Sequence, residues 1–334
     1  MGTPAKASHA IHRRARAGLL IGLVACARSG PSAPETPSNV VALGDVRVAV
    51  HTSHTANLFH AVDQISAWSP FCHSQYSKWA PSLDDKEATD ALQRHAELRR
   101  EKGWGSGIER TFYLEDGANA SEEEKRILHV LSFRLDDKLK RGDAQAKKLE
   151  DALRGESAAF ARFSKNVLAF VEVPPPRDPI PMVFVPSPGR GVGGGGANGG
   201  VVVVEIPEEG GVKSTLTTVA HELVHALMKP RLPELTEAAA RCGHGLDQTV
   251  EGEAIAYAIA PGILAYGESA GALERQRDRN ARDSSYGRFV RLAIAIRPLV
   301  REMLQRPRHD ALRAVLDATC EAAKEYEWST ADQP

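Results

Sequence analysis

Residues 214–228, STLTTVAHELVHALM, contain the pattern H-E-x-x-H at positions 221–225. On a helix, residues four positions apart lie one turn apart on the same face, so His221 and His225 can direct two imidazole rings at one point. Two imidazole nitrogens at that spacing suit a tetrahedral Zn²⁺ ion. Glu222 lies about 100° around the helix from His221. From there its carboxylate can reach a metal-bound water and act as a general base.

The residues around the motif predict a helix that packs on a core. Apolar side chains recur at positions i, i+4, i+7 and i+8 and form a face opposite the histidines: Val219, Leu223, Ala226 and Leu227. Ser214 or Thr215 is expected to cap the start of this helix, and Pro230 is expected to end it. The alternative is a helix with two surface histidines, which the three fixed letters alone do not exclude.

A catalytic zinc site usually has three protein ligands and a water, so the two histidines need a third partner. The best candidates lie in residues 247–257, DQTVEGEAIAY, which predict a second helix that Asp247 caps and Pro261 ends. Two glutamates of this helix, Glu251 and Glu253, can each supply a carboxylate. The periodicity of the segment does not choose between them.

Together the two motifs resemble those of gluzincin-type zinc metallopeptidases. Members of that family carry H-E-x-x-H on one helix and a glutamate ligand on a later helix, and residues 251–254, EGEA, resemble the E-G-x-A form of the second motif. The resemblance implies that Glu222 activates the water and that three residues bind Zn²⁺, namely His221, His225 and Glu251. It favours Glu251 over the alternative ligand Glu253.

The sequence departs from related motifs at two positions. Ile255 stands where the thermolysin-like form has an aspartate, so the carboxylate that would orient a ligating histidine is unassigned. Arg231 stands where the metzincin form requires a third histidine, which excludes that form.

The expected fold is α+β and mostly helical. Residues 40–173 form a mostly helical N-terminal region, and residues 174–334 form the metallopeptidase region that the resemblance implies to be zincin-like. Residues 201–206, VVVVEI, predict a strand just before the motif helix. Residues 189–200, GRGVGGGGANGG, are expected to be a flexible hairpin connection and not a nucleotide loop. We therefore expect a small mixed sheet whose edge strand precedes the motif helix and can pair with an extended peptide.

The start of the chain predicts export. Residues 1–25 have a basic beginning and a short apolar run, AGLLIGLVA, which is too short to span a bilayer, so they are predicted to be a cleavable signal. Residues 23–26, LVAC, resemble the lipobox of bacterial lipoproteins, in which the cysteine, here Cys26, becomes the lipidated N-terminus. Residues 26–39 predict a disordered tether. The resemblance implies a lipid-anchored protein of the bacterial cell envelope, and Ala27 favours the outer membrane. The alternative is an ordinary secretory signal with a chance cysteine.

The composition permits a substantial core. Of the 334 residues, 42% are hydrophobic and 25% are charged, and the formal net charge is −1. Nothing in that balance indicates nucleic-acid binding. In an oxidising compartment two of the remaining cysteines could form a disulfide, but the sequence does not choose the pair among Cys72, Cys242 and Cys320. It does not indicate the oligomeric state either.

Several histidines and tyrosines outside the motif have open roles. Four histidines of the N-terminal region are expected to be surface or hydrogen-bonded residues and not metal ligands: His51, His54, His60 and His73. A hydrated carbonyl develops negative charge, so a peptidase also needs a stabilising donor. The candidates are His244, Tyr257 and Tyr266.

Two functional hypotheses follow from these motifs. The first is zinc-dependent hydrolysis of peptide bonds by an envelope lipoprotein. The second is a catalytically inactive zinc-binding lipoprotein that acts as a binding or assembly module. Glu222 favours the first hypothesis, because a purely structural metal site does not need a general base.

Overall fold

The computed structural model describes residues 39–69, 72–190, 194–198, 200–243, 246–260 and 284–325. These residues belong to one compact unit, Ser38–Pro334. The predicted signal and most of the predicted tether, including Cys26, lie outside the described residues. No helix in the described part of the chain has both the length and the apolar character needed to cross a membrane.

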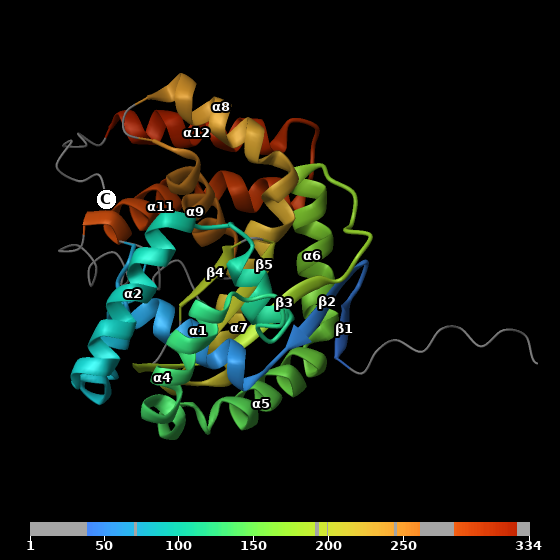
Figure 1. Ribbon diagram of the computed structural model, residues 1–334. Coiled ribbons are helices and arrows are strands. Elements are labelled where there is room, and N and C mark those ends of the chain that lie inside the picture. Colours follow the sequence, from blue (N-terminus) through green and yellow to red (C-terminus); the bar gives the residue numbers. More distant parts are fainter. Residues whose placement is uncertain are drawn as a thin grey trace, which may run out of the picture. The chain divides into compact units, whose positions relative to one another are not determined.

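The described strands form one mixed sheet of five strands in the order β1-β2-β3-β5-β4 (Figure 1). Their bounds are Val40–Leu43 for β1, Val46–His51 for β2, Ile180–Arg190 for β3, Gly195–Asn198 for β4 and Val201–Glu209 for β5. The pairs β2–β3 and β3–β5 are parallel, whereas β1–β2 and β4–β5 are antiparallel. The sheet therefore takes strands from both regions that the sequence predicted.

Helices make up most of the described chain. In the first half they are α1 (His54–Ile65), η1 (Ser74–Lys78), η2 (Ala80–Leu83), α2 (Lys86–Lys102), α3 (Ile108–Leu114), α4 (Glu122–Leu139), α5 (Gly142–Gly155) and α6 (Ser157–Val171). In the second half they are α7 (Val212–Met228), η3 (Lys229–Arg231), α8 (Leu232–Cys242), α9 (Gln248–Ile259), α11 (Ser284–Gln305) and α12 (Ala311–Lys324). The expected α+β, mostly helical fold with a small mixed sheet is confirmed.

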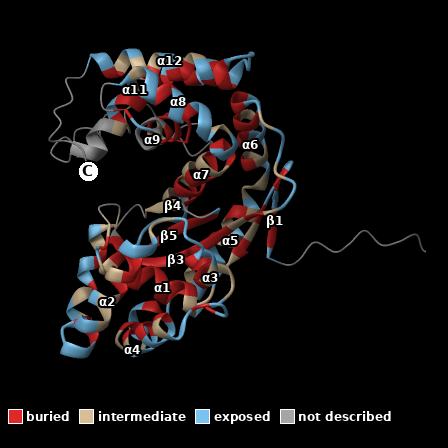
Figure 2. Ribbon diagram, turned by 45° about the horizontal axis from the view of Figure 1, so that its top comes forward, coloured by how far each residue is buried: buried red, intermediate tan, exposed pale blue. Residues whose placement is uncertain are grey.

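Two apolar cores cover the two faces of the sheet. Successive side chains of a strand point to opposite faces, and β5 supplies Val202 and Val204 to one core and Val201 and Val203 to the other. The first core contains residues of α5, α6, α7, α8, α9, α11 and α12, and the second contains residues of α1, η1, η2, α2, α3 and α4. Strands β3 and β5 are accordingly buried on both faces (Figure 2). This double burial explains the continuous apolar run of β5.

The position of the edge strand corrects one expectation. The strand directly before the motif helix, β5, lies inside the sheet, and β4 is the edge strand next to it. β4 lies within the glycine-rich stretch that was expected to be only a connection, and it pairs with β5 from Gly195↔Val204 to Asn198↔Val201. A strand of glycine, alanine and asparagine has no apolar alternation, so the sequence pattern does not reveal it.

The motif helix α7 begins earlier than expected. Its first residue is Val212 and its N-cap is Gly211, so the prediction of a Ser214 or Thr215 cap is wrong. The hydroxyl of Ser214 instead donates to the carbonyl of Gly211 at 2.7 Å. The helix ends at Met228, just before the single turn that contains Pro230.

A disulfide joins the C-terminal end of α8 to α12. It links Cys242 to Cys320, with a Cα–Cα distance of 5.6 Å. Cys72 is a free thiol, and burial raises its pKa to about 11. The structure therefore chooses the pair that the sequence left open.

Candidate metal centre

Helix α7 presents one face to the core and another to the candidate site. Its apolar residues Val219, Leu223 and Leu227 are buried against the sheet and the neighbouring helices. The two histidines lie on the other side, and their side chains keep 13% and 18% of their surface exposed for His221 and His225 respectively. The arrangement follows from the i, i+4 spacing of the histidines and from the apolar stripe opposite them.

Three side chains converge at this face. The Nε2 atoms of His221 and His225 lie 3.1 Å apart. The carboxylate of Glu253, on α9, places Oε2 3.2 Å from Nε2 of His221 and Oε1 3.3 Å from Nε2 of His225. Among the residues that the structure describes, these three form a group whose ligand atoms all lie within 4.8 Å of one another, so they could hold a metal ion.

The charges at this group favour metal binding. Burial opposes ionisation of Glu253, but His225 and His221 hold the pKa of that carboxyl well below its usual range, so it is available as an anionic ligand. Burial likewise works against a charged His225, yet the Glu253 carboxylate raises its pKa to about 9. A metal ion that takes the place of these protons would keep the same pairing of positive charge with Glu253. Two imidazoles and a carboxylate are a donor set that Zn²⁺ accepts readily.

Glu222 lies beside the group but is covered by the edge strand. It is 5% exposed, and burial raises its pKa, although the charges of His221 and His225 act in the opposite direction. A Cβ atom at Gly195 of β4 would lie 2.6 Å from Oε1 of Glu222 and 2.7 Å from its Cγ. Glycine at position 195 therefore lets the strand backbone pass directly over this carboxylate.

The periodicity of the sequence did not decide which glutamate is the third metal ligand. The structure brings Glu253 to the histidines, and Glu253 was the alternative to Glu251. The side chain of Glu251 lies outside the described residues, so its role as a ligand stays a prediction. Gly252 contributes in a different way, because a Cβ atom at this position would lie 3.9 Å from Nδ1 of His225. The backbone of α9 at Gly252 is therefore a neighbour of the His225 ring, with room for an ordinary contact.

The i, i+4 spacing of Glu253 and Tyr257 on α9 is a sequence signal that favours Glu253 as the ligand. Tyr257 lies four residues after Glu253, so both belong to one helix face. The Tyr257 ring packs edge-on against the His221 ring, with 4.6 Å between centroids. Of the candidates for a stabilising donor, Tyr257 is thus at the site, whereas His244 and Tyr266 fall outside the described residues.

A second group of polar residues lies near the metal centre and was missed at the sequence level. We call it the Glu205 cluster; its members are His60, His73, Gln75 and Glu205. His60 and His73 contact Oε1 of Glu205 at 3.0 and 2.7 Å, and Gln75 donates to Oε2 at 2.8 Å. The expectation that His60 and His73 are hydrogen-bonded residues is confirmed. A glutamate within a buried valine run was the available signal, because a buried carboxylate needs partners.

In comparisons with known proteins, no family model, no curated protein and no solved structure matches this chain. The likeness to gluzincin-type peptidases therefore rests on the two motifs, and the functional argument rests on the geometry of the site.

Proposed function

We propose that this chain is a zinc-dependent hydrolase that cleaves peptide bonds. The observation that carries the proposal is the convergence of His221, His225 and Glu253 beside the buried carboxylate of Glu222. A donor set of two histidines and one glutamate leaves a coordination position for water or substrate, which is typical of catalytic zinc and not of closed structural sites.

The residues of the chain divide the chemistry between them. Bound Zn²⁺ would supply a Lewis acid that polarises a carbonyl and makes water more acidic. Glu222 would accept a proton from the attacking water as its oxygen adds to the carbonyl carbon. The same carboxyl would then give that proton to the leaving nitrogen as the C–N bond breaks, which yields a carboxylate and an amine. Its raised pKa suits a group that must both accept and return a proton.

A peptide is the substrate class that fits the surroundings of Glu222. β4 is one of the two edge strands of the sheet, and it runs over this carboxylate. An extended chain can pair with the free edge of such a strand through backbone hydrogen bonds. The pairing would bring successive peptide bonds past Glu222 and would not depend on side-chain identity.

We place this hydrolase in the bacterial cell envelope, anchored through a lipid on Cys26, with the outer membrane as the favoured location. The support is the lipobox-like LVAC sequence together with the Cys242–Cys320 disulfide, which suits an oxidising compartment. Cys26→Ala should release the protein from the membrane fraction. Unchanged fractionation would remove the lipoprotein assignment.

The decisive experiment combines metal analysis with a broad peptide-library assay. Wild type and Glu222→Gln should both contain about one zinc per chain, the number that one such site predicts, and only the wild type should cleave. Zinc in both proteins without cleavage by either would favour the binding or assembly module. Loss of zinc from the wild type on purification without chelators would count against both hypotheses.

A further inference from the structure

We propose that Glu205 and His73 form a positioning pair that holds the start of β4, and with it the substrate-pairing edge, in register over Glu222. The effect on hydrolysis rests on the proposed function, whereas the effect on β4 can be measured without any hydrolysis.

Glu205 is the centre of the pair because it is buried and uses both of its oxygens. Oε1 accepts from Nε2 of His60 and Nδ1 of His73, and Oε2 accepts from Gln75 and from the backbone N–H of Gly194 at 3.0 Å. The backbone N–H of Glu205 in turn donates to the carbonyl of Gly194 at 2.9 Å. Gly194 is thus bound to Glu205 through both its N–H and its C=O groups.

Two successive glycines show how closely the chain passes between the two sites. A Cβ at Gly194 would collide with the ring of His73, and a Cβ at Gly195 would collide with Glu222. Neighbouring residues of an extended chain face opposite sides. The Glu205 cluster and Glu222 therefore contact this backbone from opposite sides. A displacement of the backbone away from the Glu205 cluster would change its distance from Glu222.

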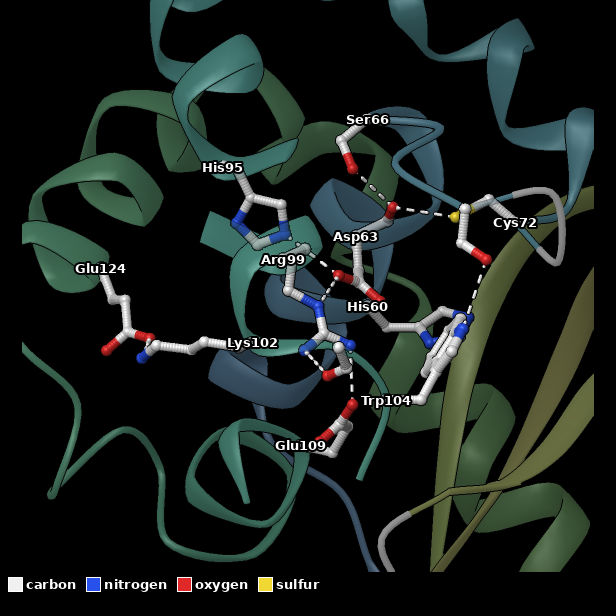
Figure 3. Close-up of polar contacts among 12 residues, drawn as sticks. His60, Asp63, Ser66, Cys72, His95, Arg99, Lys102, Trp104, Glu109 and Glu124 are labelled. Carbon is white, nitrogen blue, oxygen red and sulfur yellow. Dashed lines mark hydrogen bonds and ion pairs between the residues drawn. The ribbon is translucent and has the colours of Figure 1, made fainter. Parts of the chain in front are cut away.

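The segment that carries His73 is itself fixed to α1. The side chain of Gln64 accepts from the backbone N–H of His73 at 2.6 Å. One residue earlier, the thiol of Cys72 donates to the carbonyl of Asp63 at 3.6 Å, and the hydroxyl of Ser66 donates to the same carbonyl at 2.8 Å. Figure 3 shows these contacts around Asp63.

The Asp63 side chain is anchored in turn by buried charges. Nε of Arg99 donates to its carboxylate at 2.7 Å, and His95 contacts the same oxygen at 3.1 Å. Nη2 of Arg99 donates to Oε1 of Glu109 at 2.6 Å (Figure 3). His73 is therefore presented from a rigid support, which is what a positioning residue requires.

The charges of the pair agree with this role. Burial opposes a charged His73, but Glu205 raises its pKa, with smaller contributions from Glu222 and Glu253. The two carboxylates of the metal centre thus act on His73 from across the glycine backbone. The His73 side chain is 23% exposed whereas Glu205 is fully buried, so the pair extends from the core to the edge of the sheet.

The first test measures hydrogen exchange in β4 of the zinc-loaded full chain. Glu205→Gln should speed exchange of the β4 amides on the order of 10- to 100-fold, the size expected when hydrogen bonds to a charged acceptor are weakened. Glu208→Gln is the matched control, because Glu208 is an exposed glutamate on β5, the strand that carries Glu205. This variant should leave the exchange rates of the β4 amides unchanged. Equal exchange in wild type and Glu205→Gln would overturn the proposal. If Glu205→Gln does not fold, His73→Gln serves the same purpose, because this side chain is partly exposed.

The second test uses the clash between Gly194 and His73. Gly194→Ala should destabilise the wild-type chain, and His73→Ala should relieve much of that loss in the double variant. Gly155→Ala, where a Cβ meets nothing within 4 Å, is the control for glycine replacement and should be equally tolerated in both backgrounds. Additive effects of Gly194→Ala and His73→Ala would show that the ring does not hold this backbone.

The third test separates positioning from general stability. In peptide hydrolysis, His73→Gln should lower kcat/KM on the order of 10²-fold through misplacement of the substrate, with zinc content unchanged. His73→Asn should recover part of that loss, because Nδ2 of asparagine takes the place of the Nδ1 that contacts Glu205. The amide of the longer glutamine lies nearer to the place of Nε2. A wild type that binds zinc without cleaving peptides would sink the proposed function but leave the exchange and double-variant results to decide this inference. Full activity in His73→Gln would overturn it.

Discussion

The metal centre and the Glu205 cluster both combine histidines with a glutamate, but in opposite arrangements. Each brings two histidines to one glutamate. In the metal centre two Nε2 atoms approach to 3.1 Å and the carboxylate closes the group from one side. In the Glu205 cluster the carboxylate is central, and side-chain and backbone donors occupy both of its oxygens. Residue type alone therefore does not make a metal site; what matters is whether the lone pairs converge or are already used.

The largest expected effect concerns Glu222, the buried carboxylate between these two groups of residues. Glu222→Gln should reduce kcat on the order of 10²- to 10⁴-fold, because a general base is lost. Its zinc content should match the wild type, since no ligand changes. Steady-state kinetics and metal analysis on the same preparation provide the check, and cleavage at wild-type rates would remove Glu222 from the mechanism.

The next prediction compares the zinc affinities of variants of the two glutamates, Glu253 and Glu205. Glu253→Ala should weaken zinc binding by more than about 100-fold, beyond the loss expected for residues that only orient a ligand. Glu205→Gln should leave the zinc affinity within a few-fold of wild type, because the partners of its carboxylate are not the metal ligands. Competition with a chelator measures both affinities. Glu251→Ala belongs in the same series, and a loss of zinc there instead would restore the E-G-x-A assignment.

A smaller effect concerns the stability of the Glu205 cluster and its dependence on pH. Glu205→Gln should lower the free energy of unfolding by roughly 1.5–3 kcal/mol at neutral pH, the range for hydrogen bonds to a charged group. The pKa of Glu205 is lowered on folding, so its contribution is present above the unfolded value near 4.5 and is lost as the pH falls.

The stabilising contribution of His73 has the opposite dependence on pH. Its pKa is raised on folding, so that contribution is complete below the unfolded value near 6.5 and is lost as the pH rises through the folded value. Between these limits the wild type should be most stable relative to Glu205→Gln. Denaturant unfolding across the acidic, neutral and mildly basic range would reveal the window, and a difference that does not vary with pH would contradict the charged pair.

The smallest effect on stability is expected at an exposed histidine–aspartate contact outside both groups. His54 lies 3.4 Å from Asp136, with both side chains about half exposed. His54→Ala should change the free energy of unfolding by less than about 0.5 kcal/mol, because solvent screens such contacts. A larger loss would mean that exposure is a poor guide to the importance of histidines in this chain.

The sequence predicted those parts of the fold that local pattern determines. The S-x-x-E pattern at Ser121 and Glu124 is the signature of a capping box, and the structure has this capping box at the start of α4. The apolar run at 201–206 is strand β5, and the motif histidines share a helix face. Residues 142–171, within the region expected to be mostly helical, form two helices that part at Glu156, directly after Gly155. A glycine is a common signal for a helix end, so this break was open to prediction.

Parts of the site that depend on tertiary packing could not be predicted. Whether Glu251 or Glu253 faces the histidines depends on how α9 is rotated against α7, and both helices carry small or apolar residues around the motif. β4 has no side-chain pattern of its own, and its pairing with β5 decides its place. His73 and Glu205 are 132 residues apart in the chain, so only the fold brings them together.

The disulfide separates the candidate metal ligands into two groups along the chain. The covalent loop from Cys242 to Cys320 encloses all of α9, so Glu253 lies inside this loop while His221 and His225 lie outside it. A chain whose thiols are still reduced would have both histidines on one preformed helix, with the carboxylate helix free of this covalent restraint. If metal binding depends on this restraint, tight retention would follow oxidation, and the proposed hydrolase would mature only after it has left a reducing compartment.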